Sequence, residues 1–248
     1  PNTFNMYCHR EPRFYLTVVW NGQWFKWENR NTNFLYGGPD GGPTHDAPQN
    51  GYLNRSRVSL DYIPRDNNHP YRPAIIFRMA EAYLSYAEAL NECSERMSYE
   101  QEILNNLNKI RHRAGIAEYG TGTDENGFTR IKINFADQKE VRRLIHKERR
   151  VEFVGEGIRY HDLRRWKTAH YGIGNMNEQG ENPDWGVNGP DHGMNYYGTE
   201  YTDQGDNAFF KRTKYMDRVY PRKFYWYPIY QEEIDKDPTL VQAPFWDK

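Results

Sequence analysis

Hydrophobic positions in the middle of the chain repeat with the period of an amphipathic helix. Between about Ile75 and Asn91 they recur at offsets of 4, 7, 8 and 11 residues. This spacing predicts a helix over 75–91 with one apolar face. The residues on that face are Met79, Tyr83, Tyr86, Ala87 and Leu90.

A second helical pattern follows after a short turn. Ser98 stands three residues before Gln101, which is the spacing of a capping box and predicts a helix start at Ser98. Gly115 is predicted to end this helix in the left-handed conformation. The inward positions are Ile103, Leu104, Leu107 and Ile110. Two helices of about 15 residues joined by so short a turn are predicted to pack antiparallel, as in a tetratricopeptide unit.

A third helix is predicted to begin at Asp137, because Glu140 follows it in the same capping spacing. Its apolar positions are Val141, Leu144, Ile145, Val151 and Val154. Gly155 and Gly157 interrupt the pattern, and a short fourth helix is predicted near 159–167. The expected fold is mainly α, with tetratricopeptide-like helical hairpins over residues 76–168, aromatic-rich loops and a short β-hairpin.

Residues 1–75 are rich in Gly, Pro, Asn and aromatic side chains and are predicted to form a loop and hairpin region. The run from Arg13 to Trp20 predicts a strand, and Asn21-Gly22 is a turn signal at its end.

Residues 169–248 are predicted to form a long loop followed by an extended tail. No periodicity is sustained over 171–216, and its many rings argue against disorder, so a functional loop is expected. The aromatic and proline residues after 224 are typical of an extended segment rather than a helix.

The composition limits the classes of function. With 33 basic and 34 acidic residues the chain has no overall attraction for nucleic acid or anionic lipid. No run of 18 apolar residues is present to span a bilayer. Cys8 and Cys93 fit neither a disulfide framework nor a metal-binding spacing, so unpaired thiols are expected, while a single bridge between the two stays open. Mean hydropathy is -1.04, yet 16% of residues are aromatic, which suits a surface that is both adhesive and wet.

Four segments resemble the SusD/RagB family. The stretch Arg78–Asn91 resembles its R-x-A-E-x-Y-L-x-x-A-E-A helix, and Asn108–Gly115 is similar to its N-x-I-R-x-R-A-G helix end. Glu148–Trp166 resembles its E-R-R-x-E-x-x-x-E-G-x-R-x-x-D-L-R-R-W block, and the tail from Tyr227 resembles its closing P-I-P run. Glu11-Pro12-Arg13-Phe14 is similar to its D-P-R strand. The segments keep the family's order and correspond to about the second half of a member.

The resemblance implies a glycan-binding protein exposed at the bacterial cell outer membrane. Such a protein captures nutrient and delivers it to a TonB-dependent SusC-like transporter, without catalysis or a cofactor. Membrane contact is expected only through a lipid anchor upstream of this chain. The resemblance also implies that the charged residues of the motifs form ion pairs between helices rather than a site, namely Glu152, Glu156, Arg159, Asp162 and Arg165.

The loop regions carry side chains suited to sugars, whose C–H faces stack on rings and whose hydroxyls bind polar groups. The candidate ligand-binding rings are Trp20, Trp24, Trp27, Tyr36, Trp185, Tyr196, Tyr197 and Tyr201. Candidate polar contacts, or oxygen ligands for calcium, are Asp184, Asn188, Asp191 and Asn195, although no calcium-loop spacing is met. By contrast, Trp166, Trp226 and Trp246 lie in scaffold motifs and are expected in the core.

Two other classes of function stay open. A glycoside hydrolase would use a pair of carboxylates, but no local pattern singles out such a pair, and H-E-x-x-H and G-x-S-x-G are absent. A helical-repeat adaptor that binds a protein partner would suit the predicted hairpins. The sequence favours a binding protein over an enzyme.

Overall fold

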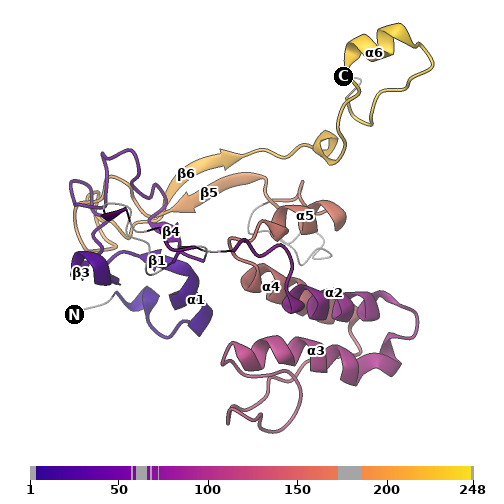
Figure 1. Cartoon of the computed structure of the whole chain (residues 1–248), viewed down its shortest axis with the longest axis horizontal. Coiled ribbons are helices and arrows are strands. Elements are labelled where there is room, and N and C mark those ends of the chain that lie inside the picture. The colour runs from indigo at the N-terminus through magenta and orange to yellow at the C-terminus, as the bar shows by residue number, and fades with distance from the viewer. Residues whose placement is uncertain are drawn as a thin grey trace. The chain divides into compact units, whose positions relative to one another are not determined.

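A computed structural model describes most of the chain (Figure 1). The described residues are 4–56, 58–59, 66–67, 69–71, 73–172 and 186–246. They divide into two compact units. The first comprises Pro1–Gly157 with His192–Thr213, and the second comprises Ile158–Asp191 with Lys214–Lys248.

The first unit is built on three helices, α2 (Met79–Glu92), α3 (Glu100–Arg113) and α4 (Gln138–Glu152). The 3-10 turn η4 (Arg96–Tyr99) joins α2 to α3, and these two helices lie side by side in Figure 1. Helix α4 also packs against α2. The mainly α fold with helical hairpins is therefore confirmed.

The buried face of α2 is displaced by one residue from the predicted face. The buried residues are Ala80, Leu84, Ala87, Glu88 and Asn91, which keep the predicted offsets but start one position later. Met79 and Tyr86 are exposed instead. Helix α2 packs against both α3 and α4, so its buried face carries alanines, which allow the helices to approach closely. It also carries polar side chains that have partners on α4, and the larger rings lie outside this face. The helix also begins at Met79 instead of 75, since Arg78 is extended.

The C-terminus of α3 forms a Schellman motif. Gly115 has φ of 66° and donates its N–H to the carbonyl of His112 at 3.0 Å, while Ile116 donates to the carbonyl of Arg111 at 3.1 Å. The left-handed glycine end is thus confirmed. The predicted capping box is wrong, because the Ser98 hydroxyl donates to the carbonyl of Glu95, the residue before η4, and α3 begins two residues after Ser98.

Helix α4 begins as predicted. The carboxylate of Asp137 accepts the N–H groups of Lys139 at 2.9 Å and Glu140 at 3.2 Å. Val141 and two further predicted core residues of this helix are buried. Val154 lies beyond the end of the helix and is exposed, because α4 ends at Glu152 and the chain turns there with Gly155 at φ of 78°.

The predicted strand from Arg13 to Trp20 is only partly correct. Its first half is the helix α1 (Pro12–Thr17), and only β1 (Val18–Trp20) is extended. Pro12 at the first helical position favours helix because its ring presets φ and its missing N–H is not needed there.

Two small sheets follow α1. Strand β1 pairs antiparallel with β4 (Tyr52–Asn54). β1 therefore does not form a hairpin at the predicted Asn21-Gly22 turn, where Gly22 has φ of 89°. The short hairpin of this region lies further along the chain, between β2 (Trp24–Phe25) and β3 (Arg30–Asn31), which residues 26–29 join. An aromatic core lies beside these strands and includes residues from the segment His192–Thr213. Its buried members are Tyr7, Trp20, Phe34, Met194, Phe209 and Phe210.

The second unit contains α5 (Ile158–Arg165), the 3-10 turn η5 (Arg222–Tyr225) and α6 (Gln231–Lys236). Its core is formed by Leu163, Ala169, Tyr220 and Tyr225. The predicted fourth helix is thus present as α5. The prediction of an extended tail is wrong at α6, where two acidic residues in the first turn and Lys236 in the last suit the helix dipole.

The region 171–216 is less irregular than predicted. Strands β5 (Gly189–Gly193) and β6 (Thr213–Arg218) form a two-stranded sheet, and residues 173–185 lie outside the described part of the chain. No helix among the described residues is long and apolar enough to cross a membrane.

The three scaffold tryptophans are not core residues, contrary to the prediction. Trp166 and Trp246 are partly buried and Trp226 is exposed. A cationic side chain lies over each ring, within 4.6–4.8 Å of its centroid. The three rings therefore lie near the surface, and the cationic side chains over them bury them in part.

Candidate functional site

Three of the predicted rings come together in the first unit. The centroid of Tyr36 lies 6.0 Å from that of Tyr196 and 5.5 Å from that of Tyr197, and the two neighbouring tyrosines are 5.1 Å apart. Their planes are tilted or perpendicular, the arrangement that aromatic pairs prefer. Tyr197 remains 70% exposed, whereas Tyr36 and Tyr196 are half-buried. We call these three residues the tyrosine cluster.

Backbone contacts hold the tyrosine cluster in place. The N–H of Tyr36 donates to the carbonyl of Gly198 at 2.8 Å, which ties its loop to the segment after Tyr197. Asn195 is buried and its amide donates to the carbonyls of Asp206 and Ala208, each at 3.1 Å. Its side-chain oxygen accepts the N–H of Tyr197 at 3.2 Å. The loop that carries the exposed ring is therefore ordered by internal hydrogen bonds.

Gly42 allows the ring of Tyr196 to lie against the backbone. A Cβ at this position would come within 2.6 Å of the Tyr196 ring and 2.7 Å of its hydroxyl. Such an approach is shorter than a carbon contact permits, so the ring would have to move. Gly42 is thus a residue that positions the tyrosine cluster.

An ion pair fixes the loop between Tyr36 and Gly42. Arg30 binds Asp40 through two hydrogen bonds of 2.6 and 2.8 Å, and Asp40 also accepts the N–H of Asn33 at 2.8 Å. The hydrogen bond from Arg30 is the main reason that the pKa of Asp40 lies below its ordinary value. The loop therefore carries a carboxylate that stays charged and already has its partner.

The other predicted rings lie in different settings. Trp20 is only 9% exposed, and its centroid lies 5.3 Å from that of Phe14 in the aromatic core, so the expectation of an accessible ring there is wrong. Trp24 is 58% exposed on β2. The Trp27 side chain and all of Trp185 lie outside the described residues.

Tyr201 is 55% exposed and lies beside the aromatic core. Its ring centroid is 6.4 Å from that of Phe210, and its hydroxyl lies 3.5 Å from the side-chain oxygen of Asn21. Desolvation, with a smaller contribution from the charge of Asp40, raises the pKa of Tyr201. This hydroxyl therefore stays neutral at physiological pH and can both donate and accept hydrogen bonds.

The predicted polar contacts are used inside the protein. Asn188 donates to the carbonyls of His170 and Tyr220, and Asp191 pairs with Arg218 at 2.5 Å. Asn195 orders its loop as described above, and Asp184 lies outside the described residues. Among the described residues no group of three or more His, Cys, Asp and Glu could hold a metal ion. Cys8 and Cys93 are free.

Glu152, one of the charged residues of the motifs, forms the expected ion pairs between helices. Buried Glu152 accepts hydrogen bonds from Arg13 at 3.0 Å, from Arg78 and from Arg113. Burial alone would raise the pKa of Glu152, but the hydrogen bonds and charges of Arg78 and Arg113 lower it. A general acid needs the opposite shift, so this carboxylate suits a structural role.

Three further predicted charges form ion pairs, but not the expected ones between helices. Glu156 binds Arg78 at 2.7 Å, while Asp162 binds Arg165 at 2.9 Å within α5. Arg159 lies over the ring of Trp166.

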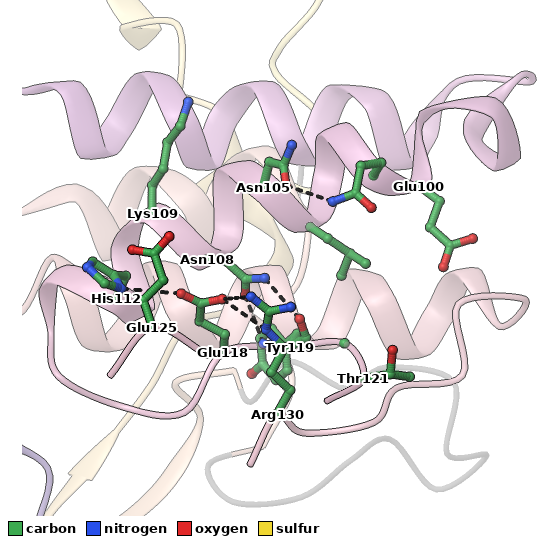
Figure 2. A pocket seen from close by; sticks show the side chains of 13 residues that line it. Glu100, Asn105, Asn108, Lys109, His112, Glu118, Tyr119, Thr121, Glu125 and Arg130 are labelled. Carbon is green, nitrogen blue, oxygen red and sulfur yellow. Dashed lines mark hydrogen bonds and ion pairs between the residues drawn. The ribbon is translucent and has the colours of Figure 1, made fainter. Parts of the chain in front are cut away.

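Sequence reasoning missed a groove on the opposite side of α3 from α2. It has a volume of about 640 Å³ and lies between α3 and the loop 118–130 (Figure 2). Gln101, Asn105 and Asn108 line it from the helix, and Tyr119 and Arg130 line it from the loop. The i, i+4 and i+7 spacing of the three amides was a signal in the sequence, because such residues share one helix face.

The described part of the chain is thus a helical-hairpin scaffold with an ordered ring cluster in its loops and ion pairs among its buried charges. Comparison with known proteins identifies the family. The model of the SusD family matches residues 2–246, and the chain therefore belongs to that family. SusD-like protein P25 of Formosa agariphila is 35% identical over 109 residues, which cover 44% of this chain and 18% of that protein.

Solved structures agree with this assignment. A SusD-like protein from Bacteroides fragilis is 26% identical with a TM-score of 0.65, and the match covers 98% of this chain and 40% of that one. A second Bacteroides fragilis structure, described as a SusD-like carbohydrate binding protein, shares the fold with a TM-score of 0.58 at 22% identity, over 94% of this chain and 42% of that one. The chain thus spans about two fifths of these structures.

Proposed function

We propose that this chain is part of a cell-surface protein that binds glycans and delivers them to a TonB-dependent SusC-like transporter of the outer membrane. In this proposal the protein is not an enzyme and needs no cofactor, and it contacts the membrane only through a lipid anchor. Membership of the SusD family supports the proposal, as does the carbohydrate-binding description of one structural relative.

The tyrosine cluster is the observation that carries the proposal at the level of residues. A sugar ring presents C–H groups that stack on an aromatic face, and Tyr197 offers such a face at the surface. Tyr36 and Tyr196 lie against it, so its ring is already ordered before a ligand arrives. An ordered ring loses little conformational freedom on binding, which favours affinity.

The polar groups near the tyrosine cluster complement its rings. The three phenol hydroxyls of the tyrosine cluster can donate and accept hydrogen bonds, as sugar hydroxyls do. The carboxylate of Asp40 is held by Arg30 and remains charged. Because this charge is already paired with Arg30, we propose a neutral oligosaccharide or polysaccharide as the ligand. It is bound by stacking on Tyr197 and by hydrogen bonds at the ring edges.

Affinity electrophoresis of the purified chain through gels that contain a panel of polysaccharides tests the proposal. We expect at least one neutral glycan to retard the chain, and Tyr197→Ala to abolish the retardation. Tyr71→Ala is the matched control, because Tyr71 is 91% exposed and lies outside the tyrosine cluster. Assays for reducing ends on the same glycans should stay at background.

Different results would contradict different parts of the proposal. If no glycan retards the chain, glycan binding by this chain is rejected. Retardation that survives Tyr197→Ala would reject the tyrosine cluster as the site, and release of reducing ends would favour a glycoside hydrolase instead.

A further inference from the structure

The groove along α3 already holds one peptide group by means of an amide side chain. The side chain of Asn108 donates to the carbonyl of Tyr119 at 2.9 Å, and its oxygen accepts the N–H of the same residue at 2.8 Å. The asparagine side chain thus makes both hydrogen bonds of one residue's backbone, as a neighbouring strand does in a β-sheet. The loop strand at Tyr119 therefore shows how extended backbone is held on this helix face.

The same face of α3 also carries two side-chain amides whose hydrogen-bonding groups are only partly occupied. The side-chain nitrogen of Gln101 donates to the side-chain oxygen of Asn105 at 2.8 Å. This bond leaves one amide oxygen and one amide nitrogen open, and within the described part of the chain neither forms another hydrogen bond. An open acceptor beside an open donor is again the complement of a peptide N–H and C=O.

The groove has the length of a short extended peptide. Figure 2 shows Glu100 near one end of the labelled residues and His112 near the other, with Asn105 between them. From Gln101 to His112 the helix rises about 16 Å, at about 1.5 Å per residue. An extended chain advances about 3.3 Å per residue, so about five residues would cover this face.

Acidic groups stand at both ends of the groove. Glu100 lies at the start of α3, and Glu125 lies beside His112 and Glu118 in Figure 2. Neither Glu100 nor Glu125 forms an ion pair within the ranges that the structure describes. Two cations of the groove already have partners, because Arg130 binds Glu118 within the groove at 2.8 Å and Lys109 lies 4.5 Å from the ring centroid of Tyr83. A ligand with basic groups at its two ends would complement these charges.

The groove is poorly suited to a sugar. Its aromatic lining residue, Tyr119, is 5% exposed, so no ring face is offered for stacking among the described residues that line it. This distinguishes it from the tyrosine cluster, whose ring Tyr197 is open. Amides without a stacking surface favour backbone recognition over recognition of a sugar.

We propose that the groove between α3 and the loop 118–130 binds an extended segment of a partner protein with basic side chains at both ends of the bound stretch. Gln101 and Asn105 hydrogen-bond its backbone, as Asn108 does for Tyr119, and Glu100 and Glu125 pair with its basic side chains. The proposal is independent of glycan binding at the tyrosine cluster.

Nuclear magnetic resonance of the ¹⁵N-labelled chain tests this site with a defined probe. The probe is the capped peptide Lys-Thr-Val-Thr-Val-Thr-Lys, and the matched peptide carries Glu at both ends. We expect the Lys-ended peptide to shift the side-chain amide signals of Gln101 and Asn105 saturably, with a Kd of about 1 mM or tighter. The double variant Gln101→Ala/Asn105→Ala lacks these two signals, so its binding is followed on the side-chain amide signal of Asn108, which lines the same groove. We expect it to bind the Lys-ended peptide about tenfold more weakly, and the parent chain to bind the Glu-ended peptide about tenfold more weakly.

The control is Gln204→Ala, which removes an exposed amide elsewhere in the first unit. Thermal unfolding shows whether the double variant is folded, which we expect because both residues are exposed. The proposal is overturned if neither peptide binds, if both bind equally, or if the double variant binds as well as the parent chain. It is also overturned if a glycan, but not the Lys-ended peptide, shifts these amide signals.

Discussion

The guanidinium of Arg78 and the carboxylate of Glu152 lie 2.5 Å apart, and they join the residue that precedes α2 to the last residue of α4. Glu152 also receives Arg13 and Arg113, while Glu148, one helical turn earlier, receives Arg13 at 2.6 Å and Arg111 at 2.9 Å. Residues from α1, α3 and α4 therefore meet in one buried charged cluster. Within it each carboxylate faces at least two guanidinium groups, which offsets the cost of removing the charges from water.

Removing the central carboxylate of this cluster should destabilise the first unit. Glu152→Ala leaves Arg78 without one of its two carboxylates and Arg113 without the carboxylate it binds. Breaking a buried ion pair in this way costs about 3–5 kcal/mol of unfolding free energy. Urea denaturation followed by circular dichroism measures the loss. Glu232→Ala on α6, which is exposed, is the control and should leave stability nearly unchanged.

The same carboxylate should make stability depend on pH in the acidic range. Its folded pKa is lowered, whereas the unfolded chain has the ordinary value of 4.5. The stabilisation is therefore complete above pH 4.5 and is lost as pH falls through the lower folded pKa. We expect the unfolding free energy of the parent chain to fall as pH drops below the ordinary value of 4.5, and that of Glu152→Gln to fall less. Equal slopes for the two proteins would show that Glu152 is not responsible.

The two tryptophans near the N-terminus should differ sharply when they are replaced. Trp20 is packed in the aromatic core, so Trp20→Ala should cost about 3–5 kcal/mol of unfolding free energy. Trp24 is exposed on a short strand, and Trp24→Ala should change stability by about 0.5 kcal/mol or less. Thermal and urea unfolding of the two variants check this. Similar losses for both would contradict the assignment of Trp20 to the core and Trp24 to the surface.

The helical part of the fold could be predicted because its signals are local. The N-cap at Asp137 and the left-handed Gly115 are each determined by contacts within a few residues, and both were predicted. The face of α2 that is buried could not be predicted as securely. The buried face depends on which helices pack on either side of α2. A prediction from the positions of large apolar residues places Met79 on that face, whereas Ala80 is buried in the structure.

The individual rings of the candidate site could be predicted from the sequence, but their contacts with one another could not. Tyr36 and Tyr197 were both named as loop rings, yet they are far apart in the sequence and meet only because the loop at Gly198 accepts a backbone hydrogen bond from Tyr36. The burial of Trp20 depends in the same way on distant residues such as Phe209 and Phe210. The groove was missed because Gln101 and Asn105 look like an ordinary polar helix face until the loop at Tyr119 is placed beside them.

Gly42 offers a test of the tyrosine cluster that leaves every ring in place. Gly42→Ala adds only a methyl group, which would meet the ring of Tyr196 at 2.6 Å and force it to move. Overpacking of this kind costs about 1–3 kcal/mol of unfolding free energy. Glycan retention in affinity electrophoresis should fall as well, because the moved ring no longer lies against Tyr197. The double variant Gly42→Ala/Tyr196→Ala removes the clash, so its stability should exceed the value obtained by adding the two single losses.

Gly122→Ala is the control for a general effect of replacing glycine. It meets no atom within 4 Å, although its φ of 82° makes some loss of stability expected. Glycan retention should nevertheless stay at the level of the parent chain, because Gly122 lies outside the tyrosine cluster. If the double variant is no more stable than additivity predicts, Gly42 does not act through Tyr196. If Gly42→Ala keeps full glycan retention while it loses stability, the position of Tyr196 does not matter for the ligand.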